Sequence, residues 1–369
     1  MMSRESAFDF IYRAVPLAAA AVSVGFGAYI LRQGRTPDDL TAGLTMFQFA
    51  LICLALYANA ATVLWQHAHP FGGVGRYGYP IFAWLVAIVA TGFSIWMMRL
   101  DIAEPVYFVV GHVTFAMAMV CVCIASVVSA SAHFPQLVEN ASLPEGATPA
   151  SRAPFRGDTV ASLSVIPVIA TLIVWGWSFF LLRGIGSGTP EAQSNGGHLM
   201  MGLAMVCTSL VALVFTVLRQ TQNTYTARER VLWPGLAFLM GLITVLWGVY
   251  FASSPIEPFR HSAGFLMIGL GMNSWAILAK VLVLAVVWKS VAPMAGRIEI
   301  IPVLTTLVCL VLSIFLFESA NPNLLTGARL LLGLGLAAYP VWAIVSVMQA
   351  HGQGTPIVRG TVPVSVRSE

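Results

Sequence analysis

The stretch "GHVTFAMAMVC" at residues 111–121 returns 86 residues later as "GHLMMGLAMVC" at residues 197–207, with six of eleven positions identical. Similar stretches begin at Ala42, Ala263 and Thr326, each with a small residue followed by Gly. Small residues recur ten positions after that Gly, at Cys53, Cys121, Cys207, Ser274 and Ala337. Small residues at one repeated position favour close helix packing in a membrane. The pattern therefore predicts five related helical hairpins, with these cysteines in structural rather than redox roles.

Hydrophobic residues make up 58% of the 369 positions and charged residues only 9%, against about 25% charged in a typical soluble domain. A chain with so few charges belongs in a lipid bilayer, and it offers no basic surface for nucleic acid. Ten apolar segments reach the roughly 20 residues that a membrane-spanning helix needs. They cover residues 14–32, 42–64, 77–98, 109–132, 160–182, 197–218, 229–252, 263–289, 298–317 and 327–349.

The ten segments pair into hairpins inside a single integral membrane domain, residues 1–351. A Pro/Ala/Ser-rich stretch at 133–159 is expected to form a cytoplasmic linker, and the polar tail at 352–369 is expected to be disordered. The sequence therefore predicts an all-α membrane protein built from quasi-repeated hairpins at residues 14–64, 77–132, 160–218, 229–289 and 298–349.

The distribution of positive charge predicts the orientation in the membrane. An even number of spans puts both termini on one side, and that side carries twelve Lys and Arg residues against six on the other. Positive residues favour the cytoplasmic face. We therefore expect a multi-pass protein of the bacterial inner (plasma) membrane with both termini cytoplasmic. Its expected partners are the lipid bilayer and, if it forms a homo-oligomer, other copies of the same chain.

Each odd-numbered segment carries a proline near its start; the first four continue with Gly and aromatic residues, the first three end in an exit arginine, and the ninth departs from this pattern. These prolines either initiate the helices or kink them, and we interpret them as structural kinks. The odd segments lack Lys and Arg before their exits and carry many Ser and Thr residues, which suit either a polar path or close packing. We expect the odd helices to form the inner set around an axis. The prolines are Pro16, Pro80, Pro167, Pro234 and Pro302.

Lys280 is the strongest candidate for a functional residue. It lies nine residues before Lys289, so it is about 13 Å from that end of its segment at 1.5 Å per residue. An ammonium at that depth needs a partner, a cavity or the bundle interior. Asn273 lies two turns earlier on the same helix face. The pair predicts an anion-attracting or proton-coupled site, and the alternative is a buried lysine satisfied by neighbouring carbonyls.

Two amides on the second segment extend this substrate pathway. Asn59 lies sixteen residues after the Gly of its hairpin, as Lys280 does in its own, and Gln48 lies on the same helix face. Such amides either bind a solute or join helices by hydrogen bonds. The histidines His112 and His198 stand at the starts of even segments, as does His261. Their separation favours helix capping and interfacial contacts over a metal or haem site.

The plan of ten helices in five proline-bearing hairpins resembles the tellurite-resistance/dicarboxylate-transporter family, which includes the slow anion channels. The resemblance implies a central anion pore lined by the odd helices and plugged by a phenylalanine, for which Phe26 and Phe93 are the candidates. The stretches "YRAVPLAAAAVSVGFGAYIL" and "ALYANAATVLWQ" also resemble a bacterial inner-membrane family of unknown function, which implies no activity.

We therefore expect a channel or transporter for a small anion or a weak acid, with no enzymatic activity, no catalytic residues, no metal and no cofactor. Two alternatives from other functional classes stay open. One is a membrane anchor subunit of a redox complex that binds quinone or haem near the histidines. The other is a membrane interaction or stress protein that transports nothing.

Overall fold

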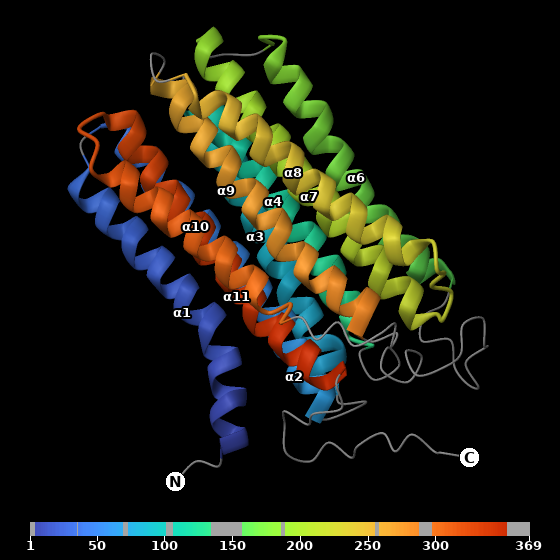
Figure 1. Cartoon of the computed structure of the whole chain (residues 1–369). Helices are drawn as coiled ribbons and strands as arrows, with labels where there is room; N and C mark the ends of the chain where they lie inside the picture. Colours follow the sequence, from blue (N-terminus) through green and yellow to red (C-terminus); the bar gives the residue numbers. More distant parts are fainter. Residues whose placement is uncertain are drawn as a thin grey trace, which may run out of the picture.

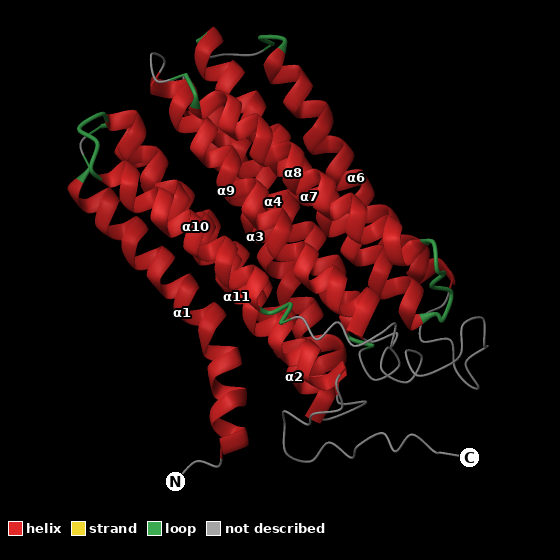
Figure 2. Cartoon of the chain, viewed as in Figure 1, coloured by secondary structure: helices red, strands yellow, loops and turns green. Residues whose placement is uncertain are grey.

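The computed structural model of the chain describes residues 4–34, 36–68, 73–100, 106–133, 157–185, 189–254, 258–287 and 297–352. Within these ranges all regular structure is helical, and ten helices are long and apolar enough to cross a membrane. Figure 2 shows this all-helical architecture, which confirms the predicted fold class. Most of the predicted linker and tail, residues 134–156 and 353–369, lies outside the described residues.

The helices run alongside one another, and the start of the first and the end of the last lie at the same end of the bundle (Figure 1). We call this the terminal end. Two short π-helical turns, Val74–Gly78 and Val283–Val287, adjoin the third and the eighth spanning helix. The main helices are α1 (Arg4–Gln33), α2 (Pro37–Ala68), α3 (Tyr79–Arg99), α4 (Val106–Ser131), α6 (Gly157–Leu182), α7 (Pro190–Thr221), α8 (Glu229–Ala252), α9 (Pro258–Leu282), α10 (Ile300–Phe317) and α11 (Pro322–Gly352).

The helices form two concentric layers. Helices α2, α4, α7, α9 and α11 contact one another in that order, and α11 returns to contact α2, so they close a ring that we call the inner ring. Each of the remaining helices, the outer helices α1, α3, α6, α8 and α10, lies in the groove between two members of the inner ring. In their apolar spans 67–89% of inner-ring residues are buried, against 28–33% for the outer helices.

This arrangement overturns the prediction that the odd-numbered segments are inner. Those segments are the outer helices, and their large apolar side chains face away from the bundle, as Leu172 (63% exposed) and Ile314 (64% exposed) do. Most of the hydroxyls that suggested a polar path donate to a carbonyl of their own helix, as Ser94 and Thr171 do, and two of them join helices. The Ser178 hydroxyl donates to the Gly197 carbonyl at 2.9 Å, and the Ser313 hydroxyl donates to the Ala328 carbonyl at 2.7 Å. Each bond joins an outer helix to the inner helix of its own hairpin.

The five prolines near the starts of the outer helices are all buried. Pro302 stands in the first turn of α10, where a proline starts a helix without kinking it. Pro16, Pro167 and Pro234 lie inside their helices, where the missing amide hydrogen favours a bend. Pro80 follows directly on the π-helical turn Val74–Gly78, so it also has helical structure before it. The ribbon of α1 bends visibly along its length (Figure 1). Only Pro302 therefore stands where a helix start, rather than a kink, accounts for it.

Glycine permits the closest helix contact, between α8 and α9. A Cβ atom added at Gly264 would lie 2.3 Å from the backbone nitrogen of Ala252 and 2.7 Å from the carbonyl oxygen of Gly248. Both neighbours are backbone atoms, which no rotamer change can move away. Hence the repeated Gly of the motif is required by the approach of an outer helix to its inner partner.

We predict that Gly264→Ala lowers the free energy of unfolding by about 2 kcal/mol, because the added methyl group forces α8 and α9 apart. Unfolding of the purified protein in mixed detergent micelles measures this change. The control is Gly235→Ala on α8, where the added Cβ meets no atom within 4 Å. Equal stability of the two variants would contradict the proposed packing.

Candidate functional site

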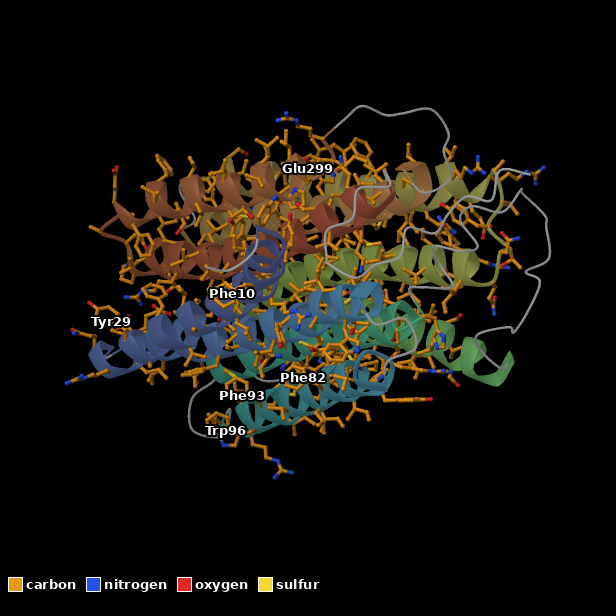
Figure 3. All side chains as sticks on the ribbon, turned by 90° about the horizontal axis from the view of Figure 1, so that it is seen from below. Phe10, Tyr29, Phe82, Phe93, Trp96 and Glu299 are labelled. Atoms are coloured by element: carbon orange, nitrogen blue, oxygen red, sulfur yellow. The ribbon has the colours of Figure 1, made fainter. Side chains whose placement is uncertain are left out.

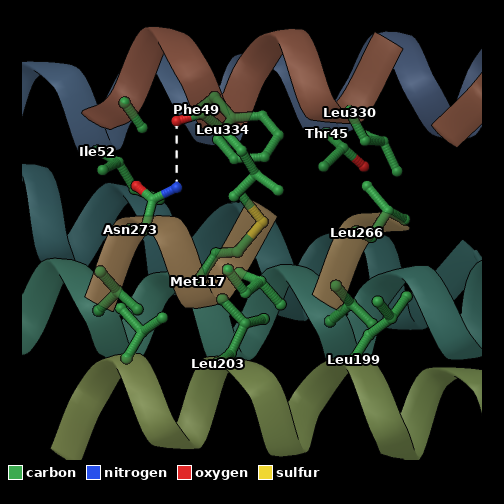
Figure 4. Close-up of a pocket in the computed structure, with 15 residues that line it drawn as sticks. Thr45, Phe49, Ile52, Met117, Leu199, Leu203, Leu266, Asn273, Leu330 and Leu334 are labelled. Carbon is green, nitrogen blue, oxygen red and sulfur yellow. Dashed lines mark hydrogen bonds between the residues drawn. The ribbon is translucent and has the colours of Figure 1, made fainter. Parts of the chain in front are cut away.

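A cavity of about 70 Å³ lies inside the inner ring, and every helix of that ring contributes to its wall. Figure 4 shows Phe49, Met117, Leu203 and Leu266 converging on this space. The lining residues are Thr45, Phe49, Ile52, Val113, Met117, Val120, Leu199, Leu203, Val206, Leu266, Leu270, Asn273, Leu330, Leu334 and Ala337. A cavity on the axis of a closed ring is the natural candidate for a solute path.

The lining residues follow the repeat motif. In α2, α4, α7 and α9 they stand two, six and nine residues after the Gly of the motif, which is one face of a helix. In α11 the lining residues stand two, six and nine residues after Ala328, not after Gly327. Ala328 is therefore the structural counterpart of the motif Gly of the other four helices, one residue later than the sequence motif predicted. Ala338, not Ala337, then matches the buried Cys53, and Arg329 matches His112 and His198.

The polar groups that line the cavity are hydrogen-bond acceptors. Asn273 donates both amide hydrogens elsewhere, to the carbonyl oxygens of Gly269 at 3.0 Å and Leu334 at 3.2 Å. Its Oδ1 is the polar atom left for a solute. The Thr45 hydroxyl donates to the Thr41 carbonyl at 2.8 Å, which also leaves only its oxygen lone pairs. The remaining lining side chains are apolar.

The lining faces of the inner helices become more buried toward the terminal end. At the opposite end of the cavity Val113, Leu199 and Leu330 are partly exposed. One turn beyond the last lining residues, the same helix faces present a layer of large aliphatic side chains that are each at most 8% exposed. We call this layer the constriction. It consists of Leu56, Ile124, Leu210, Ile277 and Val341.

Lys280 lies one turn below the constriction. It is 2% exposed, and its Nζ donates to the Oδ1 of Asn59 at 3.0 Å. Lys280 belongs to α9 and Asn59 to α2, and these helices are not neighbours in the inner ring, because α11 lies between them. The hydrogen bond therefore reaches across the interior of the ring. Within the described residues no carboxylate pairs with Lys280.

The structure thus brings three of the predicted pathway residues, Lys280, Asn273 and Asn59, to the interior of the inner ring. The fourth, Gln48, is fully buried, and its Nε2 donates to the Thr114 carbonyl at 3.2 Å. This bond joins α2 to α4, so Gln48 acts between helices rather than in the cavity wall.

Gln220, a second buried amide that joins α7 to the turn after α9, was not among the predicted residues. It is fully buried on α7, and its Nε2 donates to the Leu284 carbonyl at 2.6 Å. Leu284 lies in the π-helical turn that follows Lys280. A π turn leaves backbone carbonyls without their usual partner, and such turns are frequent at functional sites. Gln220 stands in the polar stretch "RQTQN" at residues 219–223, just after the predicted segment 197–218, so no local signal distinguished it.

Phe26 and Phe93, the predicted plugs, do not line the cavity. Both belong to outer helices: Phe26 stacks on Tyr29 with ring centroids 6.4 Å apart, and Phe93 lies 5.7 Å from Trp96. Figure 3 shows Phe93 and Trp96 at the edge of the bundle. They are placed there because the helices that carry them face lipid. The wall of the axial cavity comes from the inner ring instead, where Phe49 is the aromatic lining residue and most of the others are aliphatic.

The histidines contact aromatic rings of neighbouring outer helices. The His112 ring centroid lies 5.5 Å from that of Trp177 on α6, and that of His198 lies 5.9 Å from Trp247 on α8. The described residues contain no group of three or more His, Cys, Asp or Glu side chains that could hold a metal ion. Arg329, at the matching position of α11, instead forms an ion pair with Asp39 of α2. That pair joins the last inner helix to the first and so closes the ring.

Comparison with known proteins places this architecture in a family. No solved structure matches the chain, and the resemblance to the tellurite-resistance family stays a prediction. "Inner membrane protein YhiM" of Escherichia coli (strain K12) is 32% identical over 348 residues, which cover 92% of this chain and 97% of that protein. Residues 4–353 match the family described as "Protein of unknown function (DUF2776)". The chain therefore belongs to this family of unknown function, as its sequence predicted.

Proposed function

We propose that the inner ring forms a channel or transporter path for a small weak acid or its anion, with Lys280 as the residue that attracts the negative charge. The observation that carries this proposal is the alignment of the axial cavity, the constriction and Lys280 along one set of helix faces. A buried cation without a carboxylate partner presents positive charge to the inside of the ring.

The polarity of the cavity favours a weak acid over a permanent anion. A bare anion entering the cavity would lose its water and meet an apolar wall whose polar atoms are acceptors. A neutral carboxylic acid can instead donate its O–H to the Oδ1 of Asn273. Beyond the constriction the next polar group is Lys280, whose N–H donors suit the oxygens of a carboxylate. A solute from the open end would thus meet the acceptor Asn273 first and the donor Lys280 second. This order suits a weak acid that enters protonated and reaches Lys280 as its anion.

We expect the path to be closed in this conformation, because the buried aliphatic side chains of the constriction lie on the same helix faces between the cavity and Lys280. Passage then requires the aliphatic side chains of the constriction to move apart. Exposed side chains change rotamer within nanoseconds, but the constriction side chains are buried, so they part only when the helices that carry them shift, which takes microseconds or longer. A gate of five buried side chains therefore supports a slow, controlled passage rather than a permanently open pore.

The same proposal assigns the chain to the bacterial inner membrane with its terminal end in the cytoplasm. The name of the Escherichia coli relative supports the membrane, and the excess of Lys and Arg on the terminal side supports the orientation. The cavity then opens toward the periplasm, and Lys280 lies on the cytoplasmic side of the constriction.

The first test is uptake of labelled lactate by proteoliposomes, with chloride as the permanent anion and protein-free vesicles as the background. We expect lactate uptake above background. Lys280→Met should lower the initial rate about tenfold, which corresponds to the loss of ~1.4 kcal/mol of stabilisation along the path. Asn273→Leu should lower it in the same direction because the acceptor in the cavity is lost.

The control for this test is Ser126→Ala. Ser126 lies at a similar depth on α4, but its hydroxyl donates to the Val122 carbonyl of its own helix, so its removal should leave uptake unchanged. Uptake equal to that of protein-free vesicles would refute the transport proposal. Uptake of chloride but not of lactate would refute the assignment to weak acids.

The second test is the reactivity of single cysteines introduced on α7 toward a water-soluble maleimide. Leu199→Cys at the open end of the cavity should react, and Leu210→Cys in the constriction should not. The five native cysteines are buried and free, so their background labelling should be low. Equal labelling of the two variants would contradict a path that is open at one end and closed at the constriction.

A further inference from the structure

A second, larger cavity lies at the end of the bundle opposite the terminal end. It has a volume of about 600 Å³ and is formed by the start of α7, the end of α8 and the start of α9. Its lining includes Tyr250, which is 62% exposed, and Trp247, which is 38% exposed, both on the outer helix α8. The cavity therefore opens beside the lipid-facing surface, where aromatic residues mark the level of the headgroups.

Both signs of charge line this second cavity. The Arg260 guanidinium lies 4.8 Å from the ring centroid of Phe251 and 5.3 Å from that of Tyr250, so two aromatic faces hold it in place. Glu191, in the first turn of α7, is exposed and contributes a carboxylate to the same cavity. Arg260 has five N–H donors, so it can bind an anionic oxygen in addition to the contacts it already makes.

Two further polar groups face the cavity. Asn195 is 9% exposed, and its Nδ2 is buried without a hydrogen-bond partner. A buried amide donor that lacks an acceptor is costly unless a ligand supplies one. The Nδ1 of His198 lies 2.6 Å from the Ser194 carbonyl oxygen, which only accepts, so Nδ1 carries the hydrogen and Nε2 is left for a ligand.

We infer that this cavity binds a phosphoethanolamine headgroup, in which a phosphate and an ammonium are joined by a short linker. Arg260 and the Asn195 amide supply donors for the phosphate oxygens, and the Glu191 carboxylate accepts from the ammonium. The aromatic side chains of α8 contact the apolar part of the lipid. A purely anionic headgroup fits less well, because it would meet the Glu191 carboxylate. The site is separate from the axial cavity and does not depend on the proposed transport.

Native mass spectrometry of the full-length protein in detergent tests this inference. The probes are a short-chain phosphatidylethanolamine, a phosphatidylglycerol with the same acyl chains, and free O-phosphoethanolamine. We expect the wild-type protein to bind phosphatidylethanolamine about tenfold more tightly than phosphatidylglycerol, the ratio that one extra charge-assisted hydrogen bond gives. Glu191→Gln should abolish this preference, whereas Arg260→Gln should weaken the binding of both lipids.

Matched controls are Arg183→Gln and Glu318→Gln, which remove one charge of each sign at the same end of the bundle but outside the cavity. Both should keep the wild-type preference. Free O-phosphoethanolamine that binds as tightly as the lipid would support the headgroup site and identify a soluble source for the ligand. Equal binding of the two lipids by the wild-type protein, or an unchanged preference in Glu191→Gln, would overturn the inference.

Discussion

The hydrogen bond between Lys280 and Asn59 across the inner ring is the interaction on which the rest of the account depends. An ammonium in the middle of a bilayer is tolerated only where protein or water surrounds it. Lys280 therefore requires α9 to be an inner helix, and its bond to Asn59 requires α2 to face it across the ring interior. With these two helices fixed, the hairpin connections place α8 and α1 on the outside.

The outer and inner helices face different surroundings and therefore carry different side chains. Outer helices present large apolar side chains to lipid and small ones to the ring, where Ser178 and Ser313 bond to backbone carbonyls of their inner partners. Inner helices present aliphatic side chains to the axis. Since lipid is as apolar as these side chains, close packing and hydrogen bonds, rather than hydrophobic burial, hold the layers together. The glycines between α8 and α9 show this close packing most clearly, because a Cβ atom at Gly264 would overlap the backbone of α8.

Much of the fold was predictable from the sequence, because ten apolar segments and a repeated Gly motif are strong signals. The choice of inner layer was not, because Ser, Thr and Gly mark close packing as readily as a polar path. Inner and outer helices also differ little in how apolar their sequences are. The inner helix α7, 89% buried in its apolar span, is no more apolar by mean hydropathy than the lipid-facing α10. Lys280, a cation deep inside an even segment, was the better guide.

The candidate site was partly predictable for a related reason. Lys280 and Asn59 stand at the same offset from their motif glycines, which placed them at one depth, but only the ring geometry shows that they meet. Phe26 and Phe93 were chosen by resemblance and lie outside the cavity, because the helices that carry them face lipid. Gln220 and the ion pair between Arg329 and Asp39 depend on contacts between helices distant in sequence, which no local pattern encodes.

A double-mutant cycle on the free energy of unfolding tests the central claim most directly. Asn59→Leu alone leaves the Lys280 ammonium buried without its partner and should cost about 3 kcal/mol, whereas Lys280→Met with Asn59→Leu should recover most of that loss. Recovery in the double variant is the predicted result, because the two side chains meet across the ring. Losses that add to within about 0.5 kcal/mol would show that they do not interact, and would contradict the account.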